Sequence, residues 1–431
     1  MTSVWQKDCH LPDLSCLHGD ISTDVLVIGG GMAGLLTAYY LTQKGIPTVL
    51  VEKEKVCSAT TAGTTAKITA QHGLIYHKIL RAYPNEYGVM YYRAYSEAVE
   101  NLKKLCRKAN CDLTEKDNYV YSNDAQKIEK EYLALQKLRI PAKHQAELPL
   151  PIKTAGGIGF ENQGQFHPLK LAQYLSSCIT IYEHTKVQEM IGTTAITEHG
   201  KIHAKKVVVA THFPFINKHG SYFLKLYQHR SYMLALDGVK PLQAMYVDDD
   251  KKGMSFSSFD GNLLLGGGGH RTGKQGGNYG ELRAFYNKHY PDATERFHWA
   301  AQDTMSLDVI PYIGNYSKQT PDLYVATGFN KWGMTGAMVS AELISCMIAG
   351  QEREYAPVFS PSRSILKPQL FVNGFEAVTN LLIPTIKRCP HLGCALKYNK
   401  EERSWDCTCH GSRFSESGKV LNNPANDDLK K

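Results

Sequence analysis

Two cysteine–histidine pairs near the C-terminal end of the chain are the residues best suited to bind a metal. Cys389 and His391 form the pattern C-x-H, Cys407 and His410 form C-x-x-H, and residues 392–406 lie between the pairs. Thiolates and imidazoles are ligands of zinc and of iron–sulfur centres. Eleven cysteines in a chain with no visible signal peptide also favour metal or redox chemistry over a disulfide scaffold. We therefore predict a metal centre formed by these four residues.

Two kinds of centre fit these pairs. In a Rieske [2Fe–2S] centre two cysteines hold one iron and two histidines hold the other, and the spacing agrees with that arrangement. Cys394 and Cys409 offer two further ligands, so a structural zinc site is the alternative. The places of the histidines and the HGS sequence starting at His410 favour the Rieske centre. In it, Ser412 would donate a hydrogen bond to a bridging sulfide, whereas Phe414 cannot make the bond that a tyrosine would.

Little chain is left for strands in front of the first ligand pair. Pro368 to Leu382 has the pattern of an amphipathic helix, within a linker at 351–386. The strands that usually support a Rieske site are therefore not expected before it. We predict a shortened Rieske-type β module at 387–431 whose ligand loops pack directly on the preceding domain, with a degenerate site as the alternative.

A glycine motif near the start of the chain predicts a dinucleotide site. Residues 24–52 read as a strand, a glycine turn, a helix and a second strand. Gly29, Gly31 and Gly34 fit G-x-G-x-x-G, which allows a tight turn, close approach to a pyrophosphate and close helix–strand packing. The following helix would direct its free N–H groups at the phosphates. Glu52, at the end of the second strand, would accept a hydrogen bond from a ribose hydroxyl.

Two more stretches are predicted to contact the same cofactor. Within residues 55–71, Thr64, Thr65 and Lys67 would present hydroxyls, N–H groups and a cation to a ring system, with an ordinary solvated loop as the alternative. Residues 322–350 read as a strand, a glycine-bearing turn and a helix beginning near Thr335, whose N-terminus would hold the far end of a flavin. Because these stretches lie at opposite ends of the sequence, the cofactor domain is predicted to be discontinuous.

Composition limits the class of protein. The chain has 431 residues, 43% hydrophobic and 21% charged, as expected for a soluble protein of two or three domains. With no apolar leader and no candidate membrane span, we expect a cytoplasmic protein. The net charge of +8 is spread without a Lys/Arg block, which argues against nucleic acid as a partner. The glycines at 266–269 fit no second dinucleotide motif, and we expect a strand followed by a mobile basic loop there.

Residues 20–350 resemble the FAD-dependent oxidoreductases related to D-amino-acid oxidase and glycine/sarcosine oxidase. The resemblance rests on the N-terminal glycine motif, the VVVAT strand and the sequences HWAAQDTMSLDVIPYIG and YVATGFNKWGMTGA. With the C-terminal ligand pairs, the whole chain resembles a bacterial subgroup in which such a flavoprotein carries a Rieske domain. The sequences TAGTTAKITAQHGLIY and FSPSR are typical of that subgroup.

The resemblance implies a fold of class α/β and α+β. A discontinuous Rossmann-like FAD-binding domain would span 20–111, 164–214 and 305–350, with an inserted mixed β-sheet substrate domain at 112–163 and 215–304. A disulfide between Cys394 and Cys409 would join the two ligand loops. FAD would be bound by Gly29, Gly31, Met32, Ala33, Gly34, Glu52, Lys53, Thr64, Thr65, Lys67, Val187, Thr211, Gly328, Gly333, Met334, Thr335 and Gly336.

The expected function is that of a flavin dehydrogenase. A small amine or amino-acid derivative would be oxidised, and FAD would pass electrons through the [2Fe–2S] cluster to an external acceptor. Lys67 and His72 lie near the predicted flavin loop and are the catalytic candidates, although a structural role is equally open for each. The alternatives are an electron-transfer or redox-sensing protein that exchanges electrons with a partner protein, and an O₂-using oxidase with a vestigial cluster. A ring-hydroxylating oxygenase is excluded within this chain, because too few residues follow His410 for a second iron domain.

Overall fold

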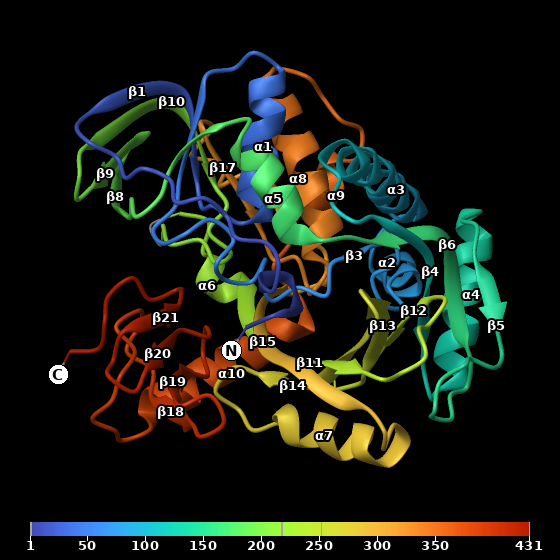
Figure 1. The fold of residues 1–431 in the computed structure, drawn as a ribbon. Coiled ribbons are helices and arrows are strands. Elements are labelled where there is room, and N and C mark those ends of the chain that lie inside the picture. Colours follow the sequence, from blue (N-terminus) through green and yellow to red (C-terminus); the bar gives the residue numbers. More distant parts are fainter. Residues whose placement is uncertain (1, 217–218, 251, 431) are drawn as a thin grey trace.

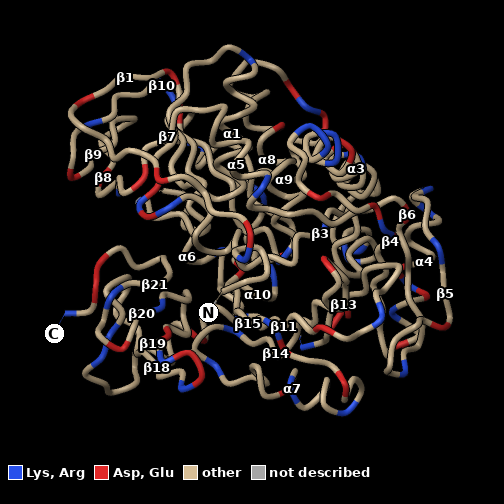
Figure 2. Tube along the Cα trace, viewed as in Figure 1, with Lys and Arg blue, Asp and Glu red and all other residues tan. Residues whose placement is uncertain are grey.

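The computed structural model describes residues 2–216, 219–250 and 252–430. Three β-sheets form its framework, and most of the helices lie around the first two of them (Figure 1). Lys and Arg are scattered over the whole trace and are mixed with Asp and Glu, without one continuous basic block (Figure 2). Among the helices of the described residues, none is both long and apolar enough to cross a membrane.

The first sheet is the predicted Rossmann-like sheet. Its main path runs β16-β17-β10-β1-β2-β7, and the β8–β9 hairpin extends it from β10. All neighbours from β17 to β7 are parallel, whereas β16 is antiparallel to β17. Burial on both faces explains the apolar run at 207–209, which lies in the sheet centre. The strands are β1 (Ile21–Ile28), β2 (Thr48–Val51), β7 (Thr180–Tyr182), β8 (Val187–Ile191), β9 (Thr194–Thr197), β10 (Lys201–Val209), β16 (Tyr312–Asn315) and β17 (Leu323–Thr327).

The two ends of the flavoprotein part fold together, as predicted. The first helix, α1 (Met32–Gln43), packs along α8 (Gly333–Ile348), and β10 separates β1 from β17. Both helices are almost entirely apolar and buried, which suits a position between the sheet and other helices (Figure 1). The other helices around them are α3 (Asn85–Ala109), α5 (Pro168–Ser176) and α9 (Ala356–Phe359).

The second sheet is mixed and has the order β15-β11-β14-β13-β12-β4-β6-β3, with β5 beside β6. Its strands come from both predicted inserted segments, and β3 comes from the loop predicted to contact the flavin; the exact domain limits stay a prediction. The strands are β3 (Lys67–Ile68), β4 (Thr114–Tyr121), β5 (Lys143–Gln145), β6 (Gly157–Gln165), β11 (Leu226–Asp237), β12 (Met245–Asp248), β13 (Ser255–Phe259), β14 (Asn262–Arg271) and β15 (Thr294–Ser306). The helices beside it are α2 (Tyr76–Ala82), α4 (Ala125–Leu138) and α7 (Asn278–His289).

The glycine run at 266–269 lies inside β14, and the predicted basic loop follows the strand at residues 272–277. A Cβ on Gly266 would lie 2.6 Å from Ser255 Oγ and 2.7 Å from Met233 Sδ, so glycine lets neighbouring strands crowd this position. The strand continues to Arg271, whose side chain is held by several hydrogen bonds. A glycine run therefore marks close packing here rather than mobility.

The third sheet is the predicted C-terminal β module. It is antiparallel in the order β18-β19-β20-β21, and all four strands follow the first ligand pair. Between residues 351 and 388 lie only short segments, α9 and α10, as predicted from the sequence. The elements are α10 (Pro368–Leu382), β18 (Leu396–Asn399), β19 (Ser404–Cys407), β20 (Arg413–Ser415) and β21 (Val420–Asn422). The short α6 (Tyr222–Lys225) contacts α10, whereas η1 (Val4–Gln6) contacts α5.

Candidate functional site

A cavity of about 430 Å³ lies between the glycine turn and the second sheet. Four of the predicted FAD residues, Gly34, Gly328, Thr335 and Gly336, do not line it. Gly34 instead serves packing, and Gly336 is covered by Phe329. The predicted residues that do line it are Gly29, Gly31, Met32, Ala33, Glu52, Lys53, Thr64, Thr65, Lys67, Val187, Thr211, Gly333 and Met334.

The glycine turn is built by close backbone contacts. Gly29 has φ +112°, and a Cβ there would lie 2.6 Å from Ala210 O. A Cβ on Gly34 would lie 1.8 Å from Gly29 O, so only glycine lets α1 approach β1 this closely. Gly31 is the N-cap of α1, whose first N–H groups therefore face the cavity wall. The turn fits a pyrophosphate at this helix N-terminus.

Glu52 follows directly after β2 and lines the cavity beside this turn. Its Oε2 accepts a hydrogen bond from Gly30 N at 2.7 Å, and its Oε1 accepts one from Glu54 N at 3.0 Å. The carboxylate thus holds the glycine turn, and each of its oxygens still has a lone pair for a ribose hydroxyl. The predicted position at the end of the second strand fits the adenosine part of FAD.

The loop at 55–66 is not an ordinary solvated loop. Trp5 Nε1 donates to Thr64 O at 2.7 Å, and Trp299 Nε1 donates to Gly63 O at 3.0 Å. Both tryptophans are buried, and residues 61–63 are buried with them. The sequence did not point to either tryptophan as a support, because each lies far along the chain from the loop. The loop is therefore fixed as a wall of the cavity.

Lys67 and His72, the two catalytic candidates, differ in what they can do. Lys67 is buried and its Nζ donates to Thr65 Oγ1 at 3.1 Å; desolvation, and then Lys116, lower its pKa to about 7. His72 also lines the cavity, but its Nδ1 lies 2.7 Å from Tyr91 Oη and its Nε2 lies 2.8 Å from Thr69 O. Burial lowers the pKa of His72 to about 3. Lys67 is therefore the better candidate to exchange a proton near neutral pH.

Sequence reasoning missed the acidic residues Asp248, Asp249, Asp250 and Asp303 of the cavity. Asp303, on β15, lines the cavity, and desolvation raises its pKa to about 6 despite the opposing charges of Lys331 and Arg230. Polar and apolar residues are mixed along β15, so one carboxyl group within this strand gives no local signal of function. Asp303 and Lys67 are among several cavity side chains with altered pKa values, which also include Asp248 and His212; such a group is a common feature of active sites.

The four predicted metal ligands converge in the C-terminal module. The rings of His391 and His410 lie 5.0 Å apart and nearly perpendicular. Among the described residues, neither ring nitrogen of His391 nor Nδ1 of His410 has a hydrogen-bond partner, although these atoms are buried. Cys389 and Cys407 are buried free thiols. Unpaired buried ring nitrogens beside two thiols fit a centre that ligates iron through two cysteines and two histidines.

The other two cysteines of the module form the implied disulfide. Cys394 is bonded to Cys409, so neither is available as a metal ligand. Their sulfur atoms and the thiol of Cys407 lie within 4.8 Å of one another. The hydrogen bond from Cys407, followed by those from Ser412 and from backbone N–H groups, lowers the pKa of Cys389 to about 7 despite burial. The site therefore favours thiolate at one cysteine even before a metal binds.

The second ligand loop is held by the flavoprotein part. Arg271 of β14 donates through Nε to Thr408 O at 3.1 Å and through Nη2 to Cys409 O at 3.0 Å. Gln302 Nε2 donates to Gly411 O at 2.9 Å. Gly411 has φ +87°, and a Cβ there would lie 2.2 Å from the side chain of Gln228. These contacts confirm the prediction that the ligand loops pack directly on the preceding domain.

The turn after β10 joins the cavity to the Cys/His centre. Thr211 and His212 line the cavity, and the next residue, Phe213, is fully buried with its ring 6.1 Å from His391 and 6.5 Å from His410. Asn423 of the C-terminal module donates to Thr211 O at 2.6 Å and to Phe213 O at 3.0 Å. Sequence analysis predicted Thr211 as a cavity residue but gave no signal for Phe213.

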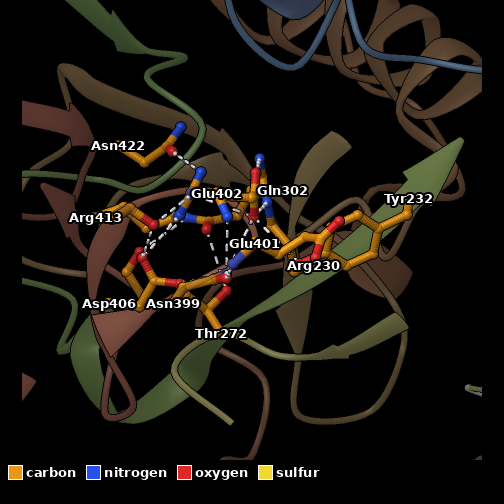
Figure 3. Close-up of polar contacts among 12 residues, drawn as sticks. Arg230, Tyr232, Thr272, Gln302, Asn399, Glu401, Glu402, Asp406, Arg413 and Asn422 are labelled. Atoms are coloured by element: carbon orange, nitrogen blue, oxygen red, sulfur yellow. Dashed lines mark hydrogen bonds and ion pairs between the residues drawn. The ribbon is translucent and has the colours of Figure 1, made fainter. Parts of the chain in front are cut away.

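A buried network of charges fixes the module on β11 (Figure 3). Arg230 binds the Glu402 carboxylate through Nε and Nη2, with an Nε–Oε2 distance of 2.8 Å. Arg413 Nη2 lies 3.2 Å from the same Oε2, and its Nε lies 3.0 Å from Asp406 Oδ1. Tyr232 donates to Glu402 at 3.2 Å. Each charge is paired, as burial requires.

Comparison with known families matches both parts of the chain. Residues 24–347 match the family model described as DAO, FAD dependent oxidoreductase, and residues 376–431 match the Rieske [2Fe-2S] domain. The matches support FAD as the cofactor of the first part and a [2Fe–2S] cluster, rather than zinc, as that of the second.

Similar proteins agree with these matches. YhfW of Bacillus subtilis (strain 168), which carries the name of a Rieske 2Fe-2S iron-sulfur protein, is 32% identical over 493 aligned positions covering 99% of this chain and 97% of the relative. L-proline dehydrogenase from P. horikoshii aligns with a TM-score of 0.67 at 17% identity, over 80% of this chain and 98% of that chain. Glycine oxidase from Geobacillus kaustophilus aligns with a TM-score of 0.66 at 18% identity, over 80% of this chain and 99% of that chain. At these identities the two solved structures show a shared fold.

Proposed function

Because the chain belongs to the DAO family of FAD-dependent oxidoreductases and carries a C-terminal Rieske domain, we propose that it is an amine or amino-acid dehydrogenase with an internal electron carrier. FAD takes two electrons from an organic substrate and can release them singly, whereas a Rieske cluster carries one electron. The proposed reaction therefore ends with transfer of electrons from the cluster to an external acceptor.

The observation that carries this proposal is the position of Phe213. It lies one residue from the cavity wall and contacts both histidines of the Cys/His centre. The Asn423 side chain fixes the same turn from the side of the Rieske module. Such a contact supports a short route from the cavity to the iron that the histidines hold.

The proposed substrate class rests on the cavity and on the relatives. The two solved structures bear the names of L-proline dehydrogenase and glycine oxidase, so we extend amino-acid chemistry to this chain as part of the proposal. Protonated Lys67 would bind a substrate carboxylate, and Asp303 would bind its amino group or accept a proton from it. Both side chains line the same cavity as the glycine turn.

The oxidase with a vestigial cluster is the less favoured candidate. All four ligands converge, and Arg271 and Gln302 both bind the second ligand loop. A site without function would not need these supports. An electron carrier without a small-molecule substrate stays a second candidate, because the cavity does not identify one substrate.

The test is an anaerobic screen of amines and amino acids against the purified holoenzyme. Bleaching of the flavin absorbance by one substrate class, without O₂, is the expected result. If no amine or amino acid reduces the flavin but a protein electron donor does, the dehydrogenase proposal is wrong and the chain is an electron carrier. Stoichiometric peroxide in air, with an oxidised cluster, would support the oxidase.

A further inference from the structure

Helix α10 exposes its apolar side chains to solvent. Phe371, Phe375, Val378 and Leu382 recur at helical spacing on one face, and they are 71%, 70%, 57% and 77% exposed. Most amphipathic helices bury this face against the protein. In α10 the arrangement is reversed, so the apolar face has no partner among the described residues.

The polar face of α10 is bound to the Rieske module and its surroundings. Asn373 is buried, and its Oδ1 accepts a hydrogen bond from Arg271 Nη1 at 2.9 Å. Asn380 is also buried, and its carbonyl oxygen accepts from Ala395 N at 3.0 Å. Glu376, on the same side, pairs with Lys274. These contacts fix the rotation of the helix about its axis. The apolar face therefore points to solvent in the folded protein, and its exposure does not depend on local unfolding of the helix.

The apolar surface extends beyond the helix at both ends. Leu392, the residue after the ligand His391, is 42% exposed and adds the tip of the first ligand loop to it. Gly393 beside it lies close to Leu381, because a Cβ there would be 3.8 Å from Leu381 Cδ2. We define the α10 surface as Leu366, Phe371, Val372, Phe375, Val378, Leu381, Leu382, Ile383, Ile386 and Leu392, all of them exposed.

The charges around this surface indicate what covers it. Between residues 368 and 386 the only ionisable side chain is Glu376, which is already paired with Lys274. Lys367 lies just before the helix, and the exposed Lys387 and Arg388 follow the apolar segment. An uncharged apolar face with cations at its edges complements a bilayer with anionic headgroups.

We propose that the α10 surface binds the surface of a membrane that contains anionic lipid. The helix has 15 residues, about 22 Å in length, so it would lie in the interface rather than cross the bilayer. Its polar face would carry the second ligand loop through Arg271, and Leu392 would place the tip of the first ligand loop at the lipid. An electron acceptor dissolved in the membrane would then lie near the cluster. Only this statement about the electron acceptor rests on the proposed function.

Vesicle flotation of the full-length holoprotein tests the proposal without turnover. Wild-type protein should float with vesicles of equimolar phosphatidylglycerol and phosphatidylcholine. Phe371→Ser with Phe375→Ser should weaken binding by about a hundredfold, because each phenylalanine contributes about a factor of ten to apolar transfer. The matched control is Leu133→Ser with Ile191→Ser, which changes side chains that are 56% and 61% exposed outside the surface. This control should bind as wild type does.

Lys387→Glu separates the electrostatic part of binding. It should weaken binding to the anionic vesicles several-fold and leave any binding to pure phosphatidylcholine unchanged. Unchanged flavin and cluster absorbance would show that each variant is folded. The proposal is wrong if wild-type protein does not float with the vesicles. A dimer that the phenylalanine substitutions dissociate would then show that the α10 surface binds a second copy of the chain, and a monomer would show that it binds neither. Equal loss in the Leu133 and Ile191 control would also overturn it.

Discussion

Arg230 on β11 and Glu402 in the turn between β18 and β19 form a buried ion pair between the flavoprotein part and the Rieske module. Their side chains are 8% and 6% exposed, and Arg230 Nε lies 2.8 Å from Glu402 Oε2 (Figure 3). The pair fixes the module on the same sheet that forms one wall of the cavity. It therefore helps to set the distance between the two redox centres.

Arg230→Met should loosen this contact. Glu402 would keep its contacts with Arg413 and Tyr232, so the cost should lie below the about 3–5 kcal/mol of a buried charge left unpaired. We expect a lower free energy of unfolding and slower reduction of the cluster by the flavin, with the FAD content unchanged. Denaturant unfolding and rapid-mixing absorbance measure the two effects. The control Arg283→Met removes a more exposed pair with Glu295 and should change neither by much; equal effects of both variants would contradict the prediction.

The same pair predicts a loss of stability in acid. Burial raises the pKa of Glu402, but the hydrogen bonds and charges of Arg230 and Arg413 outweigh burial and hold that pKa below its usual value. The folded state thus binds fewer protons than the unfolded state does. This contribution to stability is full above the usual pKa of a glutamate and is lost as the pH falls through the lowered value. Unfolding measured against pH should show the loss in wild type and a smaller loss in Glu402→Gln.

Gly34→Ala should abolish FAD binding. The added Cβ would lie 1.8 Å from Gly29 O, so α1 must move away from the glycine turn. We expect protein purified with little FAD but with an intact iron–sulfur spectrum, since α1 holds none of the four Cys/His ligands. Gly280→Ala in α7 is the control, because nothing lies within 4 Å of its Cβ position. Normal FAD content in Gly34→Ala would show that the turn adjusts.

Lys67 should give substrate oxidation a dependence on pH. Desolvation lowers its pKa to about 7 in the free enzyme, so the ammonium is present below that pH and is lost above it. If the ammonium binds the substrate carboxylate, kcat/KM falls as the pH rises through about 7. Lys67→Arg keeps the charge and should remove this limb, whereas Lys67→Met should lower kcat/KM chiefly below about pH 7, where wild type carries the ammonium. A profile unchanged by Lys67→Arg would assign the limb to another group.

Ser412→Ala should lower the reduction potential of the cluster. The Ser412 side chain is fully buried and hydrogen-bonds the thiol of Cys389. Hydrogen bonds to the sulfurs of a cluster stabilise its reduced, more negative state. Loss of one should lower the potential by about 60 mV, which corresponds to about 1.4 kcal/mol for one electron. A redox titration measures this, with Ser415→Ala as the control, because Ser415 Oγ bonds Ser417 instead.

Local patterns were sufficient for the elements that carry their own signals. The glycine motif, the bounds of α10 and the four converging ligands all follow from residue type and spacing. Contacts between distant segments had no such signal. Trp5 supports a loop about sixty residues away, and Arg271 at the end of β14 holds the second ligand loop.

The same limit applies to the wall of the cavity. Gly328, Thr335 and Gly336 are near the predicted turn in sequence but do not line the cavity, and their contact with FAD stays a prediction. Thr335 Oγ1 donates instead to Thr69 O at 3.0 Å. Asp303 lines the cavity because its strand belongs to the second sheet, and the pairing of that sheet could not be derived from the sequence.

The most direct test of the proposed function is anaerobic mixing of the holoenzyme with a substrate from the screen, followed by electron paramagnetic resonance of samples frozen at successive times. The account predicts that flavin bleaching precedes the signal of a reduced Rieske cluster, and that Phe213→Ala slows only the second event. Flavin that is fully reduced while the cluster stays oxidised, although dithionite reduces that cluster, would contradict it.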